Sequence, residues 1–256
     1  MTDIVLRADR LSRRFGGLTA VDAVSLDLRM GEIHAVIGTN GAGKSTLINL
    51  LTGEIQPSSG RVELQGRDIS RWSQPRRARA GIGRSYQRTT IFPEFSVWEN
   101  CRLAAQSRRP QPWKIWQTAA ACPAASAGAE AALQAVGLNG QGDQIAGQLS
   151  HGGKRLLEIA MCLATEPLVL LLDEPLAGMG ADESERMLSL LEGLKHGHAI
   201  LLVEHDMDAV FRVADRITVM VNGEVIASDS PDRIRDNPQV RFAYLGDTEP
   251  DTPVAA

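Results

Sequence analysis

A glycine-rich stretch at residues 38–45 is the strongest indication of chemistry in the sequence. It reads Gly-Thr-Asn-Gly-Ala-Gly-Lys-Ser and fits the phosphate-loop pattern G-x-x-x-x-G-K-[ST]. Glycines let the backbone curl so that amide N–H groups point at a phosphate, and the following helix adds the positive end of its dipole. We expect Lys44 to reach the β- and γ-phosphates and the Ser45 hydroxyl to bind Mg²⁺. An ordinary glycine turn is the weaker alternative, since a strand-like run precedes the loop and a helical pattern follows it. The predicted phosphate-binding residues are Gly38, Asn40, Gly41, Ala42, Gly43, Lys44, Ser45 and Thr46.

Two adjacent carboxylates, Asp173 and Glu174, follow the apolar run 168–172. In open α/β sheets ligands bind at the carboxyl ends of strands, where these side chains would lie. We expect Asp173 to hold the hydrated Mg²⁺ and Glu174 to orient and deprotonate an attacking water. Without the glycine loop, a solvated helix cap would be the better interpretation. A phosphate loop alone does not choose between GTPases, kinases and other ATPases, but the sequence lacks the guanine-reading Asn-Lys-x-Asp run.

A third motif, LSHGGKR at residues 149–155, narrows the class. It resembles the LSGGQ signature of the ATP-binding subunits of ABC transporters, and its distance from the Asp-Glu pair is similar to the family's. Ser150 and the glycine amides open a helix, which gives a second helix start able to bind an anion. In that family this surface caps the γ-phosphate of an ATP held by the other subunit. The resemblance therefore implies a dimer in which Ser150 and Gly152 contact the nucleotide of the second chain.

Three further positions match the family in order. Phe15 corresponds to the aromatic residue that stacks on adenine, and Gln87 to the glutamine that contacts Mg²⁺ and senses the transmembrane partner. His205 corresponds to the switch histidine that holds the γ-phosphate. A single Gln or His is usually structural, so these roles depend on the stronger motifs around them.

Two segments depart from the family pattern. His151 and Gly153 stand where the signature has a glycine and its glutamine. A glutamine side chain could form a hydrogen bond across the dimer, of a kind that contributes about 0.5–1.5 kcal/mol, and Gly153 cannot. Ser150 and Gly152 remain, so we expect the phosphate cap to survive. Residues 176–179, Leu-Ala-Gly-Met, replace the usual SALD-type loop and lack its aspartate. The resemblance therefore does not extend to the aspartate through which the two ATP sites of the family communicate.

Several short runs are similar to those of a particular branch of the family, the ATPases of branched-chain amino-acid and urea/amide importers. These runs are RRFGGLTAVD, LSHG, EPLAGM and the closing Tyr-Leu-Gly. The resemblance implies hydrolysis of ATP to ADP and phosphate with Mg²⁺, in which Glu174, His205 and Lys44 are catalytic. It also implies transmembrane permease subunits, a second identical or related ATPase subunit and, indirectly, a periplasmic solute-binding protein. The alternatives are the ATPase of a lipid or polysaccharide exporter, an ABC ATPase acting on ribosomes or DNA, and a nucleotide-binding regulator without turnover.

The composition agrees with a folded protein that does not bind nucleic acid. The 256 residues are 43% hydrophobic and 23% charged, with 27 Lys and Arg against 31 Asp and Glu, a net charge of −4. General nucleic-acid binders carry the opposite charge balance. Three cysteines without a CxxC pair fit a reducing compartment, and the first residues lack the apolar core of a signal peptide. We expect a cytoplasmic protein, held at the inner face of the membrane by permease subunits.

Short apolar runs alternate with helical patterns along most of the chain. This order predicts an α/β fold with a mainly parallel sheet, and the resemblance makes it a P-loop NTPase (RecA-like) core with an N-terminal antiparallel β portion. The expected strands are residues 32–38, 61–64, 168–172, 199–203 and 217–221, and the expected helices are 44–51, 150–163 and 182–195.

The middle of the chain has no strand pattern from about residue 92 to 165. We predict an inserted α-helical subdomain at 91–165 with the signature motif, a nucleotide-binding core of 1–90 and 166–245, and a mobile tail at 246–256. The stretch 107–128 is expected to be irregular because its prolines interrupt helices. Within it, Trp113 and Trp116 are expected to form a small packing cluster, with a contact to a partner as the alternative.

A predicted helix start lies beside three aromatic residues. Ser96 and Glu99 form an S-x-x-E capping box. Phe92, Phe95 and Trp98 gather at this start, either as packing between core and subdomain or as a groove for a short helix of a transmembrane subunit. Both interpretations stay open at the level of sequence.

Overall fold

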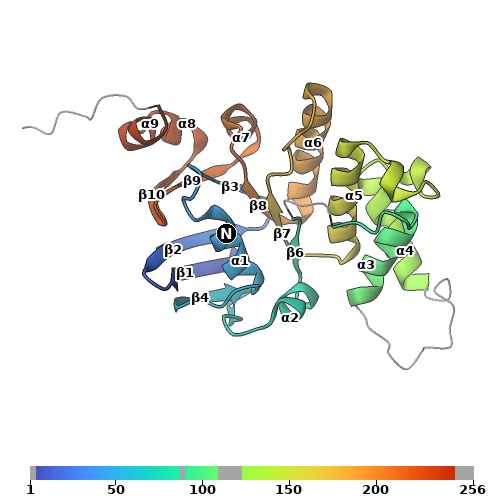
Figure 1. Cartoon of the computed structure of the whole chain (residues 1–256), viewed down its shortest axis with the longest axis horizontal. Coiled ribbons are helices and arrows are strands. Elements are labelled where there is room, and N and C mark those ends of the chain that lie inside the picture. The colour runs from blue at the N-terminus through green and yellow to red at the C-terminus, as the bar shows by residue number, and fades with distance from the viewer. Residues whose placement is uncertain (1–3, 87–89, 109–122, 246–256) are drawn as a thin grey trace, which may run out of the picture. The chain divides into compact units, whose positions relative to one another are not determined.

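The computed structural model describes residues 4–86, 90–108 and 123–245 (Figure 1). The chain divides into two compact units, which are described separately. The first unit is Met1–Arg71 with Ala199–Ala256, and the second is Trp72–His198. The predicted glycine loop belongs to the first unit, and the predicted carboxylates and signature motif belong to the second.

The first unit contains an antiparallel sheet, as the family resemblance implies. Its strands are β1 (Ile4–Phe15), β2 (Leu18–Arg29), β4 (Ser59–Leu64) and β5 (Arg67–Asp68), in the order β2-β1-β4-β5. The pairing of β1 with β2 shifts register at several points, and Arg10 and Ala23 adopt left-handed backbone conformations. Such irregularities interrupt the alternation of buried and exposed residues.

The first unit also holds the parallel strands that position the glycine loop. Strand β3 (Ile33–Gly38) lies between β8 (Ala199–Val203) and β9 (Arg216–Val221), parallel to both, and β10 (Glu224–Asp229) pairs with β9 in the antiparallel sense. Every residue of β3 and β8 is buried, as expected for strands covered on both faces. The helices of this unit are α1 (Lys44–Thr52), α7 (Met207–Val213), α8 (Pro231–Arg235) and α9 (Pro238–Leu245).

The second unit combines two parallel strands with a group of helices. Strand β6 (Ile82–Arg84) pairs with β7 (Val169–Asp173). Helices α3 (Val97–Arg108), α4 (Pro123–Ala135) and α5 (His151–Ala164) pack on one another, as Figure 1 shows. The unit is completed by α2 (Gln74–Arg79) and α6 (Ala181–Leu194). No strand lies in the described part of 92–165, which agrees with the predicted helical character of this region.

The expectation of irregular structure over 107–128 is wrong where the chain is described. Helix α3 continues to Arg108, and α4 begins at Pro123. Proline is tolerated in the first turn of a helix, where its missing N–H would have no partner, and seven alanines follow it within α4. The rest of the stretch, including Trp113 and Trp116, lies outside the described residues, as does 246–256.

His34, on β3, is a buried titratable side chain in the first unit. Its side chain is 1% exposed. Because a carbonyl oxygen only accepts, Nδ1 donates to the backbone of Asp27 at 3.1 Å. Nε2 is then left to accept from the Thr218 hydroxyl at 2.7 Å, and Thr218 in turn pairs with Ser228 at 2.7 Å. Burial lowers the pKa of His34 to about 4.

We expect the stability of the protein to fall as the pH drops from about 6.5 to 4. In this window the unfolded state binds a proton at His34 that the folded state does not, which lowers the free energy of unfolding by roughly 3 kcal/mol at the acid end. Urea unfolding at a series of pH values measures this slope. His34→Gln should reduce the slope, whereas His196→Gln, at an exposed position, should leave it as in the original chain. An equal slope in all three proteins would contradict the assignment.

Candidate functional site

The glycine loop connects β3 to α1 and owes its path to close backbone contacts. A Cβ atom at Gly38 would lie 2.4 Å from the carbonyl oxygen of Met220, and one at Gly43 would lie 2.3 Å from that of Ala20. Gly41 and Gly43 also have φ values of 82° and 99°, in the left-handed region. Glycine is therefore required at these positions by geometry as well as by any approach of a phosphate.

The start of α1 is built to accept an anion. Gly43 is its N-cap and supplies no side-chain hydrogen bond, and the first turn contains no acidic residue. The Lys44 ammonium group donates to the carbonyl oxygens of Gly38 at 2.6 Å and Thr39 at 3.1 Å, so it spans the loop. Ser45 is exposed at the same helix start. Amide groups, an ammonium group and a hydroxyl thus gather at one helix N-terminus, as phosphate binding requires.

His205 emerges at the same edge of the sheet as the glycine loop. Strands β3 and β8 are parallel, with Val36 opposite Val203, so the residues that follow both strands lie side by side. The His205 side chain is 64% exposed, and its Nδ1 lies 3.8 Å from the carboxylate of the fully buried Glu204. The histidine is thus presented to solvent next to a buried acid.

Phe15 ends β1 at the tip of the β1–β2 hairpin. Its side chain is 45% exposed, and the guanidinium group of Arg13 lies 4.6 Å from its ring centroid. A large exposed aromatic ring at a hairpin tip is available to stack on a flat ligand. The structure therefore places the predicted adenine-stacking residue on the surface of the first unit.

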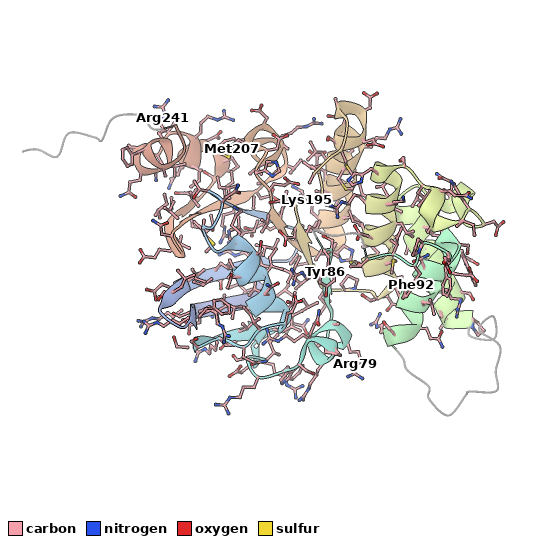
Figure 2. The ribbon with its side chains drawn as sticks, viewed as in Figure 1. Arg79, Tyr86, Phe92, Lys195, Met207 and Arg241 are labelled. Atoms are coloured by element: carbon pink, nitrogen blue, oxygen red, sulfur yellow. The ribbon has the colours of Figure 1, made fainter. Side chains whose placement is uncertain are left out.

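In the second unit, Asp173 lies at the end of β7 and is 4% exposed. Its backbone N–H donates to the Ser85 hydroxyl at 3.3 Å, and its carboxylate lies 3.7 Å from the guanidinium group of Arg84. The Arg84 guanidinium group also lies 4.6 Å from the ring centroid of Tyr86, which is labelled in Figure 2. The parallel pairing of β6 with β7 brings these side chains to the predicted metal-binding carboxylate.

Glu174 has an unusual backbone conformation. Its φ is 50°, in the left-handed region, and its carbonyl oxygen accepts from the N–H of Ala177 at 3.2 Å. For a residue with a Cβ atom this conformation costs about 1–2 kcal/mol. The chain therefore leaves the extended path of β7 at Glu174 and enters a tight turn.

Tyr86 and Thr90, the described residues nearest to Gln87 on either side, are both hydrogen-bonded to α5. Gln87 itself lies in 87–89, outside the described residues. Arg155 donates to the carbonyl oxygen of Tyr86 at 2.8 Å, and Glu158 accepts from the N–H of Thr90 at 2.7 Å. The two α5 side chains pair with each other at 3.0 Å and are nearly fully buried. Burial raises the pKa of Glu158, whereas its hydrogen bonds to Thr90 and Arg155 oppose the shift. Sequence reasoning missed this pair, although opposite charges three residues apart on a helix are a recognisable signal.

Helix α5 begins with the signature motif. Ser150 is its N-cap, and the Ser150 hydroxyl accepts from the N–H of Gly153 at 3.0 Å. His151 donates from Nε2 to the carbonyl oxygen of Ala177 at 3.1 Å. A Cβ atom at Gly178 would lie 3.1 Å from the same ring nitrogen. The signature helix is therefore in direct contact with the loop that follows Glu174, which the sequence did not predict.

The candidate residues form two sets, one in each unit. The first unit joins the glycine loop and Lys44 with the segment that contains His205. The second unit joins Asp173 with the residues after β6, and the signature helix with the loop after Glu174. Among the described residues, no group of three or more His, Cys, Asp or Glu side chains is placed to hold a metal ion, and no helix is long and apolar enough to cross a membrane.

Comparisons with known proteins all point to the ATP-binding proteins of ABC transporters. A family model described as ABC transporter matches residues 21–177, and one described as branched-chain amino acid ATP-binding cassette transporter matches residues 224–250. The high-affinity branched-chain amino acid transport ATP-binding protein LivG of Salmonella typhimurium is 39% identical over 96% of this chain and 100% of its own length. The corresponding protein BraF of Pseudomonas aeruginosa is 38% identical with the same coverage.

Solved structures give the same result for the fold. A nucleotide-free ATP-binding cassette from an ABC transporter has a TM-score of 0.82 and 30% identity, and covers 95% of this chain and 100% of that chain. An ADP conformation of an ATP-binding cassette has the same TM-score and identity. The predicted fold class is confirmed.

Proposed function

This chain belongs to the ABC transporter family of ATP-binding proteins, and from that premise we propose that it drives the uptake of branched-chain amino acids. It is an ABC-type ATPase, which binds ATP and hydrolyses it to ADP and phosphate. The observation that carries the choice of solute is its similarity over nearly the whole chain to relatives named for this transport. A related small polar solute such as urea is the second candidate from the sequence motifs.

We propose that the first unit binds the nucleotide through three kinds of contact. The loop amides and the Lys44 ammonium group bind the β- and γ-phosphates, and the ring of Phe15 stacks on adenine. The support is the glycine-capped start of α1, the position of Lys44 across the loop and the exposure of Phe15. His205 holds the γ-phosphate from the neighbouring strand end. Asn40, Gly41, Ala42 and Thr46 complete the proposed phosphate contacts.

Mg²⁺ fits the oxygen ligands that the chain offers. We propose that the Ser45 hydroxyl, the Asp173 carboxylate and Gln87 hold it together with phosphate oxygens, the usual ligand set for this ion. Bound there, Mg²⁺ would neutralise charge that develops on the transferred phosphoryl group. Asp173 suits the role because it is nearly buried at a strand end and is held next to Arg84 and Ser85.

Glu174 is the proposed general base. Its carboxylate accepts the proton of the water that attacks the γ-phosphate, as the bond to the leaving ADP breaks. The left-handed turn at Glu174 supports this role, because strained backbone is concentrated at functional positions.

Two chains are proposed to close around ATP. Ser150 and Gly152 of one chain contact the γ-phosphate bound by Lys44 of the other, so each nucleotide joins both polypeptides. Hydrolysis removes this shared anchor and the chains separate. Closing and opening then drive alternating access in the membrane subunits.

The proposed surface for a permease subunit lies on the second unit. Phe92 and Phe95 are 50% and 42% exposed, and their rings stack with centroids 5.5 Å apart (Phe92 is labelled in Figure 2). The capping box is formed, with Ser96 N–H bonded to Glu99 at 2.9 Å and Glu99 N–H to the Ser96 hydroxyl at 3.1 Å. Asn100 binds both backbone groups of Phe92, which fixes the aromatic pair. A short amphipathic helix of a permease would cover these exposed rings, and this contact would place the chain at the inner face of the membrane.

Transport by a purified complex tests the proposed function. We expect the chain to co-purify from detergent-solubilised membranes with hydrophobic permease subunits. The complex, reconstituted into vesicles with its solute-binding protein, should take up leucine, isoleucine or valine only when ATP is supplied on the side of this chain. Uptake of urea in place of these amino acids would correct the solute. ATP-driven export, or salt-sensitive binding to nucleic acid without any permease, would contradict the importer.

A further inference from the structure

The hydroxyl of Ser150 has a second partner within the same unit. It lies 3.3 Å from Oε1 of Glu183, which is in the first turn of α6. The same hydroxyl oxygen accepts from the N–H of Gly153 at 3.0 Å. Since a carboxylate only accepts, the Ser150 proton is directed at Glu183. The serine that caps the signature helix thus connects it to α6.

The Glu183 carboxylate lies directly over the first turn of α5. A Cβ atom at Gly152 would be 2.5 Å from both the carboxyl carbon and Oε1 of Glu183, far inside contact distance. The Glu183 carboxylate therefore occupies the space that a side chain at position 152 would take, and a Cβ atom there would push this flexible side chain aside. A cavity of 630 Å³ adjoins this contact and is lined, among others, by Ser150, Gly152, Met179, Glu183 and Arg186.

A carboxylate in this position has the chemistry of the ligand that the signature helix is proposed to bind. It carries negative charge at the positive end of a helix dipole and accepts the Ser150 proton. A hydroxyl has one proton and cannot donate it to Glu183 and to a phosphate oxygen at the same time. The γ-phosphate of a second chain can engage Ser150 only when the contact with Glu183 is broken.

We propose that Glu183 is a positioning residue that acts as an internal substitute for the γ-phosphate. It occupies the start of the signature helix in the separate chain and must leave when the nucleotide of the second chain arrives. Glu183 therefore raises the ATP concentration at which two chains close. This inference rests on the proposed function, because it needs a dimer with Ser150 on the nucleotide of the other chain.

A purely structural role for Glu183 predicts the opposite effect. If the carboxylate only fastened α5 to α6, its loss would leave the signature helix less well placed, and more ATP would be needed for closure. If it competes with phosphate, its neutralisation favours closure. A charge at a helix N-terminus changes binding by about two- to fivefold at each site. The sign of the change thus separates the two roles.

The test uses a Glu174→Gln background, in which the closed dimer is not consumed by hydrolysis. The dimer fraction is measured by analytical ultracentrifugation as ATP is titrated in the presence of Mg²⁺. Glu183→Gln keeps the size of the side chain and removes its charge. Asp182→Asn is the matched control, because Asp182 is an exposed acid in the same helical turn.

We expect the Glu183→Gln protein to reach half-dimerisation at an ATP concentration about two- to fivefold lower than the Asp182→Asn protein, with a difference that shrinks in 0.5 M salt. An equal or higher ATP requirement for Glu183→Gln, or a difference that salt does not change, would overturn the inference and leave the dimer intact. Absence of an ATP-dependent dimer in all proteins, including the Glu174→Gln parent, would overturn the proposed dimer and the inference with it.

Discussion

Glu174→Gln is expected to stop ATP turnover and to leave nucleotide binding intact. Glutamine has the size of glutamate and fits the same left-handed turn, but it cannot take the proton of the attacking water. Loss of a general base lowers the rate of the chemical step by about 10²- to 10⁴-fold. Because binding precedes this step, the ATP-bound dimer should accumulate.

Phosphate release at saturating ATP measures the turnover of this variant, and calorimetry with ATP measures its affinity. Glu192→Gln is the matched control, since Glu192 is an exposed glutamate near the end of α6 and should keep full activity. Turnover equal to that of the control would refute the role of Glu174. Lost turnover together with lost ATP binding would show that Glu174 acts in binding and not as the base.

The parts of the fold that the sequence predicted have strong local signals. Strands β3, β7, β8 and β9 are short apolar runs that end in glycine, acid or turn residues, and they are buried as such runs require. The start of α1 follows from the glycine spacing of the phosphate-loop pattern. The capping box of α3 needs only residues 96 and 99 to be recognised. In each case the physical cause lies within a few residues.

Other elements had no such local signal. The full lengths of β1 and β2 were not predicted because left-handed residues such as Arg10 interrupt their alternation. The start of α4 was missed because Pro123 was interpreted as a helix breaker, whereas the first turn accepts it. The short helices α7, α8 and α9 were not predicted from the sequence. One buried residue of each, Val210, Ile234 and Val240, packs in the core cluster against β3 and β9, so their stability comes from this packing more than from their own sequences.

In the candidate site, too, only the features with a local sequence signal could be predicted. Lys44, Asp173 and Ser150 could be identified from motifs. The contacts of Ser150 with Glu183 and of His151 with Ala177 could not, because each joins residues more than twenty positions apart. Such contacts depend on how α5, α6 and the loop after β7 pack, and the spacing of apolar residues in the sequence does not predict this packing.

The two departures from the family pattern meet in one contact. His151 replaces a signature glycine, and Ala177 belongs to the loop that replaces the SALD-type sequence. The His151 side chain, which the family's glycine lacks, is hydrogen-bonded to the loop in which the family's aspartate is missing. The two departures are therefore one structural feature, and replacement of the His151 side chain would remove this hydrogen bond between the two segments.

Lys44→Ala is expected to lose affinity for ATP itself, in contrast to the change at Glu174. The ammonium group is nearly buried and spans the loop through the carbonyl oxygens of Gly38 and Thr39. Its removal takes away the positive charge that would bind the phosphates and the hydrogen bonds that join the two ends of the loop. Charge-assisted hydrogen bonds of this kind contribute about 1.5–3 kcal/mol, so the dissociation constant should rise about ten- to a hundredfold.

The thermal stabilisation produced by ATP separates this loss of binding from a loss of folding. A ligand that binds only the folded state raises the unfolding temperature, so Lys44→Ala should remain folded without ATP and gain little stability when it is added. Lys195→Ala, at the end of α6, should show the full ATP-dependent rise. An undiminished rise in Lys44→Ala would mean that the glycine loop binds phosphate through its amides alone. The Lys44 ammonium group would then stabilise the conformation of the loop and would not contribute to binding of the nucleotide.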